Sequence, residues 1–147
     1  MNARFLRRVP MALATVLLFG ACSALVLPPK NTSEGLLMGT IWQLQQLGAV
    51  GAIAGNQPTL SFSQGGKASG SGSCNQFNGS VTVSGKSITF GTLASTKMAC
   101  SDALNAQEST YFKALQQAEW FTILGSSLTI YTKSMDQPLV FFRTSPE

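Results

Sequence analysis

The side chains best able to do chemistry in this sequence are three cysteines, Cys22, Cys74 and Cys100. A cysteine can act as a nucleophile, bind a metal ion or form a disulfide, and each use requires different neighbours. The chain contains no histidine, which removes the Cys-His and Ser-His-Asp arrangements of nucleophilic catalysis and the commonest zinc ligand. The role of each cysteine therefore depends on the compartment in which the chain works.

The N-terminal segment has the layout of an export signal. Its first ten residues, MNARFLRRVP, contain three arginines and no acid, the apolar run MALATVLLFG follows, and Gly20 and Ala21 precede Cys22. The apolar run is too short to span a bilayer comfortably. A basic region, a short apolar region and small residues before a cleavage point are typical of a signal peptide. We therefore expect residues 1–21 to be a signal peptide.

The stretch LFGAC, residues 18–22, resembles the lipobox of bacterial lipoproteins, although Phe19 stands where a leucine is commoner. The resemblance implies that the thiol of Cys22 receives a diacylglycerol and that this cysteine becomes the acylated N-terminus. Ser23 follows the cysteine and is not the aspartate linked with inner-membrane retention in enteric bacteria, so the resemblance implies the outer membrane, facing the periplasm. Several acyl chains anchor a small domain firmly. The alternative is a plain secretory signal that contains a cysteine.

The positive charge of the chain belongs mainly to this N-terminal segment. The chain has ten Lys and Arg against six Asp and Glu, and three of the ten lie within residues 1–21. The rest of the sequence has no run of Lys and Arg to suggest nucleic-acid binding, which would need such a cluster to neutralise phosphates. We expect residues 22–35, which include Pro28-Pro29, to be a lipidated N-terminus and flexible tether. Residues 36–147 then form one domain.

Export narrows the choice for Cys74 and Cys100. In an oxidising compartment, two remaining thiols in a small domain are most simply a disulfide. Their spacing is not the CxxC of redox-active pairs, and two cysteines without histidine make a poor metal site. We expect a structural disulfide and neither a metal nor a cofactor, with a redox-active pair or free thiols as alternatives. Closing a loop of this length stabilises a fold by roughly 3–4 kcal/mol.

Hydrophobic alternation predicts a mostly β fold. Segments with period two are expected as eight short antiparallel strands, at residues 39–47, 58–63, 67–73, 80–84, 87–90, 120–124, 127–131 and 139–143. In the first of them, Trp42, Leu44 and Gln46 are expected to share one face. The pair Asn78-Gly79 is typical of a two-residue type I′ hairpin turn.

One segment has the period of a helix instead. In SDALNAQESTYFKALQQAEW, residues 101–120, an apolar face includes Leu104, Tyr111 and Leu115, and Ser101 is placed to cap the N-terminus. We predict an α+β, mostly β fold of about eight antiparallel strands in a small curved sheet or barrel. One helix is inserted before the last three strands. Such curvature or closure avoids exposed strand edges.

Four stretches of the domain resemble the META domain, or HslJ-like, family: GSCNQFNGSV, ITFGTLASTKMACSD, AQESTYFKALQQAEWF and LTIY. The resemblance covers most of residues 36–143. It implies a small curved β-barrel with a helix and an envelope lipoprotein linked to heat shock and the stress response. No settled catalytic activity comes with the family.

The remaining polar candidates each have a functional and a structural interpretation. Asn75, Asn78 and Lys97 are a possible binding loop drawn together by the disulfide, although Asn is also a common turn residue. Ser95 and Lys97 could form a Ser-Lys dyad, but no oxyanion-hole motif or nucleophile elbow accompanies them. Large aromatic residues at strand spacing are expected in the core or at its rim, namely Trp42, Trp120, Phe121 and Phe141.

We therefore expect a protein that binds and does not catalyse, because the usual general base near neutral pH is missing. The expected partners are the membrane, through Cys22, and a protein or another envelope component. One alternative is a periplasmic inhibitor of a lytic enzyme, because SGSG at residues 69–72 is similar to the serine-glycine loop of lysozyme inhibitors. Another is a carrier of a small apolar ligand. An accessible apolar interior would favour the carrier, a protruding Ser/Lys loop the inhibitor, and a filled interior with an exposed apolar patch the binding module.

Overall fold

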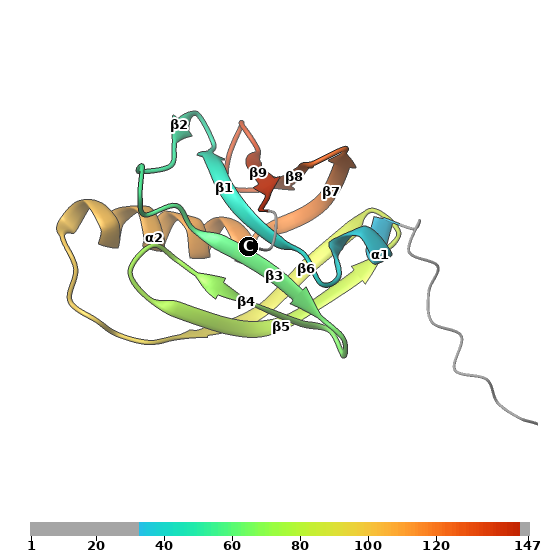
Figure 1. Ribbon diagram of the computed structural model, residues 1–147, viewed down its shortest axis with the longest axis horizontal. Helices are drawn as coiled ribbons and strands as arrows, with labels where there is room; N and C mark the ends of the chain where they lie inside the picture. The colour runs from blue at the N-terminus through green and yellow to red at the C-terminus, as the bar shows by residue number, and fades with distance from the viewer. Residues whose placement is uncertain (1–32, 145–147) are drawn as a thin grey trace, which may run out of the picture.

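The fold is an eight-stranded antiparallel barrel with a helix at each end (Figure 1). The computed structural model describes residues 33–144, so the signal peptide, Cys22 and most of the tether lie outside the described residues. The elements are α1 (Ser33–Leu37), β1 (Ile41–Leu47), β2 (Val50–Gly51), β3 (Thr59–Ser63), β4 (Lys67–Ser71), β5 (Gln76–Ser84), β6 (Ser87–Ser95), α2 (Asp102–Gln116), β7 (Ala118–Leu124), β8 (Ser127–Thr132) and β9 (Leu139–Arg143). The predicted fold class and the place of the long helix before the last three strands are confirmed.

Consecutive strands pair with each other around the barrel, and the last pairs with the first. The order is β1-β3-β4-β5-β6-β7-β8-β9, and β9 closes the barrel on β1. At this closure Thr144 donates its N–H to the carbonyl of Ile41 at 3.0 Å. The two-residue strand β2, which the alternation did not indicate, pairs with the end of β1. Closure satisfies strand edges that would otherwise be open to other chains.

The pairing between β6 and β7 involves fewer residues than any other pairing around the barrel, and α2 connects these two strands in sequence. Ser87 and Trp120 are the single pair of register partners there, and the Phe121 N–H donates to the carbonyl of Lys86 at 2.9 Å. In Figure 1, α2 lies across the left end of the barrel and α1 at its right end. The buried residues of α2 are Gln107, Glu108, Tyr111, Ala114 and Leu115. The helix therefore covers the end of the barrel where β6 and β7 are not paired with each other.

Side chains fill the interior of the barrel. The largest fully buried ones are Trp42, Tyr111, Phe121, Phe141, Leu37, Leu44, Leu60, Ile88, Leu115, Leu128, Ile130 and Leu139. Phe77 packs edge-on against Tyr111 and Phe112 of the helix, with ring centroids 6.0 Å and 5.2 Å apart. An eight-stranded barrel is just narrow enough for side chains to occupy it completely. The core and the helix are thus one packed unit.

The predicted hairpin turn at Asn78-Gly79 is wrong. Both residues lie inside β5, where Asn78 is the register partner of Ser69 in β4. Gly79 is needed for close approach instead, because a Cβ there would lie 2.8 Å from the carbonyl of Thr92 and 2.7 Å from the side chain of Leu93. The chain turns a few residues earlier, between β4 and β5.

The predicted alternation in the first strand also fails after Leu44. The register of β1 against β9 shifts between Leu44 and Gln46, which is the mark of a β-bulge. The extra residue turns Gln46 outward, where it is exposed, and brings Leu47 into the core. A bulge has no signal in hydrophobic periodicity, so the shift was not predictable from the strand's own sequence.

The two helix starts differ from expectation in small ways. Residues 33–35, assigned to the tether, form the beginning of α1, which is fixed by the fully buried Leu37. Ser101 occupies the N-cap position of α2 as predicted, but its side chain makes no capping hydrogen bond. Neither helix of the described part of the chain has the length and apolar character needed to cross a membrane.

Candidate functional site

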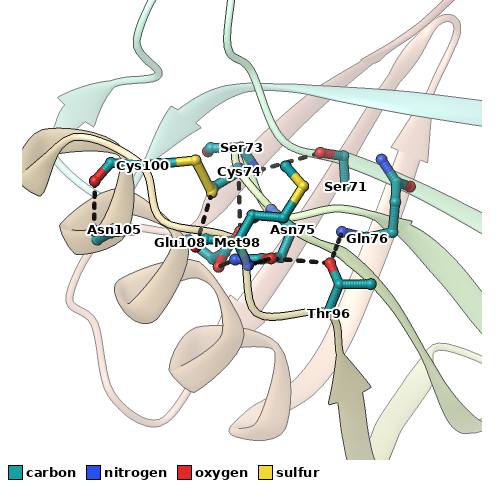
Figure 2. Close-up of a disulfide and its surroundings, with 10 residues drawn as sticks. All are labelled: Ser71, Ser73, Cys74, Asn75, Gln76, Thr96, Met98, Cys100, Asn105 and Glu108. Carbon is teal, nitrogen blue, oxygen red and sulfur yellow. Dashed lines mark hydrogen bonds between the residues drawn. A yellow bond between two sulfur atoms is a disulfide. The ribbon is translucent and has the colours of Figure 1, made fainter.

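The predicted site lies where three connections meet helix α2. These connections are the turn between β4 and β5, the segment between β6 and α2, and the loop between β2 and β3. A disulfide between Cys74 and Cys100 joins the first two, with Cα atoms 6.2 Å apart and a sequence separation of 26. Figure 2 shows this bond beside the helix. The predicted disulfide is confirmed.

Glu108 of α2 holds the turn between β4 and β5. Its carboxylate accepts the N–H of Cys74 at 3.1 Å and the N–H of Asn75 at 2.6 Å. It also accepts the side-chain Nδ2 of Asn75 at 2.7 Å. Glu108 is buried, and a buried carboxylate is stable only where donors replace the water it has lost. Three donors from one turn supply that replacement and fasten the turn to the helix.

Asn75 extends the same contacts to the segment after β6. Its side-chain oxygen accepts the hydroxyl of Thr96 at 2.9 Å and the N–H of Met98 at 2.7 Å (Figure 2). Its amide nitrogen is already used by Glu108, and the residue is 5% exposed. Both ends of the amide are therefore engaged inside the protein, which agrees with the structural interpretation of this asparagine.

Gln107 attaches the loop between β2 and β3 to helix α2 by hydrogen bonds, as Glu108 attaches the turn between β4 and β5. Its Oε1 accepts the N–H of Ile53 at 2.8 Å, and its Nε2 donates to the carbonyl of Asn56 at 3.1 Å. The same Nε2 donates to the hydroxyl of Ser73 at 2.7 Å. We call Asn75, Gln107 and Glu108 the polar clamp. The residues they join are 21 to 54 positions apart, so the sequence could not show what Gln107 and Glu108 do.

The turn held by the polar clamp is sterically constrained. At Gly72, a Cβ would lie 2.5 Å from the ring of Phe112 and 2.6 Å from Oε2 of Glu108. Ser73 has a φ of 118°, the one positive φ of a non-glycine residue within residues 33–144. Such a conformation costs on the order of 1–3 kcal/mol and persists only where its surroundings enforce it. The Gln107 bond to its hydroxyl is one such restraint.

The remaining predicted site residues are separate and exposed. Asn78 points outward from β5, and Lys97 lies on the segment between β6 and α2. Ser95 is the last residue of β6 and is exposed. Among the described residues, no hydrogen bond joins Ser95 to Lys97, and no group of three or more acids or cysteines is placed to hold a metal ion. The disulfide region thus brings Asn75 into the interior and leaves Asn78 and Lys97 on the surface.

A second candidate region, which the sequence reasoning missed, lies on the outer side of β7, β8 and β9. Trp120 and Tyr131 are register partners and stack, with ring centroids 3.6 Å apart and planes 6° from parallel. Trp120 is 42% and Phe142 47% exposed. The outward residues of these strands that we call the aromatic face are Trp120, Thr122, Thr129, Tyr131, Val140 and Phe142. None of them is charged.

Residues 35–146 match the family model of the META domain. A solved NMR structure of a protein from Burkholderia xenovorans is 28% identical, with a TM-score of 0.61 over 76% of this chain and 86% of that one. A second NMR structure is 27% identical, with a TM-score of 0.60 over 73% of this chain and 91% of its own. None of the functionally curated proteins matches. The motifs that carried the resemblance contain the polar clamp, since Cys74-Asn75 and Gln107-Glu108 both belong to them.

Proposed function

This chain belongs to the META domain family, and we propose that it is an envelope lipoprotein that acts by binding a partner and has no catalytic activity. In this proposal Cys22 carries the lipid that holds the domain at the outer membrane, facing the periplasm. The stress-related role implied by the family resemblance is the setting in which it binds. The observation that carries the proposal is the aromatic face on a barrel whose interior is filled.

The aromatic face has the properties of a contact surface. Trp and Tyr give a large contact area at a low entropic cost, because few torsions must be fixed on binding. The stack of Trp120 on Tyr131 already fixes both rings, so the face is preorganised. It contains no charge that a partner would have to desolvate. We therefore propose an uncharged protein surface as the partner.

The filled barrel argues against the carrier of an apolar ligand. Trp42, Phe121 and Phe141 are fully buried within the interior that a carrier would keep open. The inhibitor is disfavoured by the place of residues 69–72. Ser69 to Ser71 belong to β4, where all three pair with β5 and Ser69 also pairs with β3, so these residues form no protruding loop.

The chemistry of the chain supports binding without catalysis. It has no histidine, and Cys74 and Cys100 are joined in a disulfide. Glu108, the buried acid, is occupied by three donors from the turn it holds. A general base at neutral pH needs a group that is both free and close to its proton donor, and the described side chains offer no such pair.

A photo-crosslinking amino acid in place of Thr129, at the centre of the aromatic face, tests the binding surface in intact cells. The matched control carries the same amino acid in place of Lys97, on the loop first predicted from the sequence. We expect a partner to be captured from position 129, and capture to disappear when Trp120→Ser is added. Capture from position 97 alone would return the binding site to the loop and contradict the proposal.

The anchor is tested separately by Cys22→Ser. Loss of the acylated cysteine should move the protein from the membrane fraction to the soluble periplasm or leave it unprocessed, because no other lipid attachment site is proposed. The localisation of the variant is measured by fractionation. Normal processing together with membrane retention would show that Cys22 is not the anchor.

A further inference from the structure

One end of the barrel combines exposed apolar side chains with an excess of basic residues. We call it the α1 end, and it comprises α1, the turns between β3 and β4, β5 and β6, and β7 and β8, and the end of β9. These parts lie at the right of Figure 1, opposite α2, except that β9 is seen nearly end-on. A groove of about 730 Å³ is lined by residues from α1, the turn between β3 and β4, β5 and Arg143. The described chain enters the barrel here, through α1.

Both ends of the barrel expose large apolar side chains, namely Leu36, Ile41 and Leu124 at the α1 end and Val50, Ile53 and Met98 at the other, so it is the charge beside them that sets the α1 end apart. Leu124, at the tip of the hairpin between β7 and β8, is 79% exposed, the highest value among the large hydrophobic residues described. Leu36 of α1 is 36% exposed and lines the groove together with Met38 and Val83. Since α1 packs beside β7, these apolar groups occupy one side of the molecule. Exposed apolar groups that are contiguous usually have a partner.

The two ends of the barrel also differ in charge. The basic residues of the α1 end are Lys67, Lys86 and Arg143, and its acid within the described residues is Glu34. The opposite end has three basic residues, Lys97, Lys113 and Lys133, against four acids, Asp102, Glu108, Glu119 and Asp136. The net charge is therefore +2 at the α1 end and −1 at the other. A surface that combines basic and apolar side chains suits an anionic lipid surface.

The length of the tether decides which surface is within reach. Ten residues, 23–32, separate Cys22 from α1, and a chain of this length spans at most about 35–40 Å. A short tether keeps the domain near the membrane at an effective concentration of roughly millimolar, so weak contacts between the domain and the membrane are sufficient for docking. If Cys22 is acylated, the bilayer that holds its acyl chains is therefore the surface nearest to the α1 end.

We propose that the α1 end docks on the anionic phospholipid headgroups of the membrane that carries the anchor. Lys67, Lys86 and Arg143 contact the phosphates, and Leu36 and Leu124 enter the layer between headgroups and acyl chains. This docking depends on the proposed lipid anchor and adds to it a defined orientation of the domain on the membrane. The polar clamp then lies on the side of the barrel away from the membrane. The aromatic face lies on the flank of the barrel, accessible to a partner in the periplasm.

Tryptophan reporters in the acylated full-length product, reconstituted into vesicles with brominated acyl chains, test this docking. Leu124→Trp places a reporter at the α1 end, and Met98→Trp, at a residue that is 60% exposed near the polar clamp, is the matched control. Both are made with Trp120→Phe to lower the background. In vesicles that contain phosphatidylglycerol, we expect Leu124→Trp to be quenched about twofold or more beyond Met98→Trp. High salt should reduce that difference, because it screens the basic residues.

Charge reversal gives a second test that leaves the fold unchanged. Lys67→Glu combined with Lys86→Glu should restore the fluorescence of Leu124→Trp, while the protein still floats with the vesicles through its lipid. Flotation with equal quenching of the two reporters, or quenching that charge reversal does not change, overturns the docking and leaves the anchor standing. A product that does not float removes the anchor, and the docking with it.

Discussion

The polar clamp and the aromatic face belong to the same barrel but use their side chains in opposite ways. The clamp gathers an acid and two amides beside a disulfide, the residue types that usually suggest a reaction or a ligand. Asn75 and Glu108 are nevertheless buried and bonded to backbone groups. The aromatic face consists of residues that usually fill a core, yet Trp120 and Phe142 are nearly half exposed.

The burial of polar residues in the clamp and the exposure of aromatic residues on the face have different physical causes. A turn and a loop packed against a helix must replace the water lost from their backbone groups, and side-chain carboxylates and amides do this well. Family motifs can therefore record the requirements of folding. An outward position on a closed barrel has no such requirement, since threonine also suits a strand and the cross-strand pair of Trp120 and Tyr131 adds only roughly 0.2–1 kcal/mol to the sheet. We therefore propose that the large aromatic residues exposed at such positions contact a partner.

The strongest test of the clamp is Glu108→Ala. Removing the carboxylate leaves three buried donors without an acceptor, and each unsatisfied donor costs roughly 1–3 kcal/mol. We expect the free energy of unfolding to fall by about 4 kcal/mol, as measured by denaturant titration. The control is Glu119→Ala, which removes an exposed ion pair with Lys133 and should change stability by less than about 1 kcal/mol. Equal effects of the two variants would show that the clamp is not structural.

Removal of the disulfide comes next in size. Replacing Cys74 and Cys100 together by alanine frees a loop of 26 residues in the unfolded chain. The expected loss is about 3 kcal/mol in the chain-entropy model. Because the polar clamp still holds the same segments, the variant should remain folded at room temperature, as checked by thermal unfolding. An unfolded variant would mean that the clamp cannot position the turn without the crosslink.

Gly72→Ala tests how closely the turn approaches the helix. The new methyl group must displace Phe112 or Glu108, and such overpacking costs roughly 1–3 kcal/mol. Gly51→Ala is the matched control, because the nearest atom to a Cβ there is a carbonyl oxygen 4.0 Å away. We expect the control to change the unfolding midpoint by little. A neutral Gly72→Ala would contradict the close packing.

The smallest effect at neutral pH concerns Tyr111, whose hydroxyl donates to the carbonyl of Thr59 at 3.2 Å. Burial raises the pKa of Tyr111 well above its usual value. The unfolded chain therefore releases this proton near pH 10 while the folded protein keeps it. Stability should be fully present below about pH 10 and should then fall by up to about 1.4 kcal/mol per pH unit as pH rises toward the folded pKa.

Comparing the wild type with Tyr111→Phe isolates this effect. The variant lacks the ionisable hydroxyl and loses one hydrogen bond, worth about 1 kcal/mol. Its unfolding free energy should decline less steeply above pH 10 than that of the wild type. Parallel decline in the two proteins would mean that Tyr111 does not titrate with unfolding.

Much of the fold was predictable because its signals are local. Alternation in segments such as Ser127–Thr132 and the helical period around Tyr111 depend on near neighbours. The disulfide was predicted from the count of thiols in a chain that we expected to be exported. Asn78-Gly79 was misread because the same pair serves a tight turn and a close approach between strands. Only the position of Leu93 across the sheet separates the two uses.

The sites were less predictable because they depend on distant partners. Nothing near Glu108 in sequence reveals that its carboxylate meets Asn75, 33 residues away. The outward direction of Trp120 follows from the bulge between Ala118 and Trp120, and its stack on Tyr131 fixes the ring there. Both are properties of the assembled sheet, so the sequence alone placed this residue in the core or at its rim.

We propose that the clamp stabilises the protein and that the aromatic face binds its partner. The most direct test is the yield of partner crosslinked by formaldehyde in intact cells, compared between two double variants at equal levels of folded protein. We predict that Trp120→Ser with Tyr131→Ser lowers the yield about tenfold or more, because hot-spot aromatics dominate binding energy. Asn78→Ser with Lys97→Ser should leave it unchanged. A full yield from the first variant and loss from the second would contradict the account.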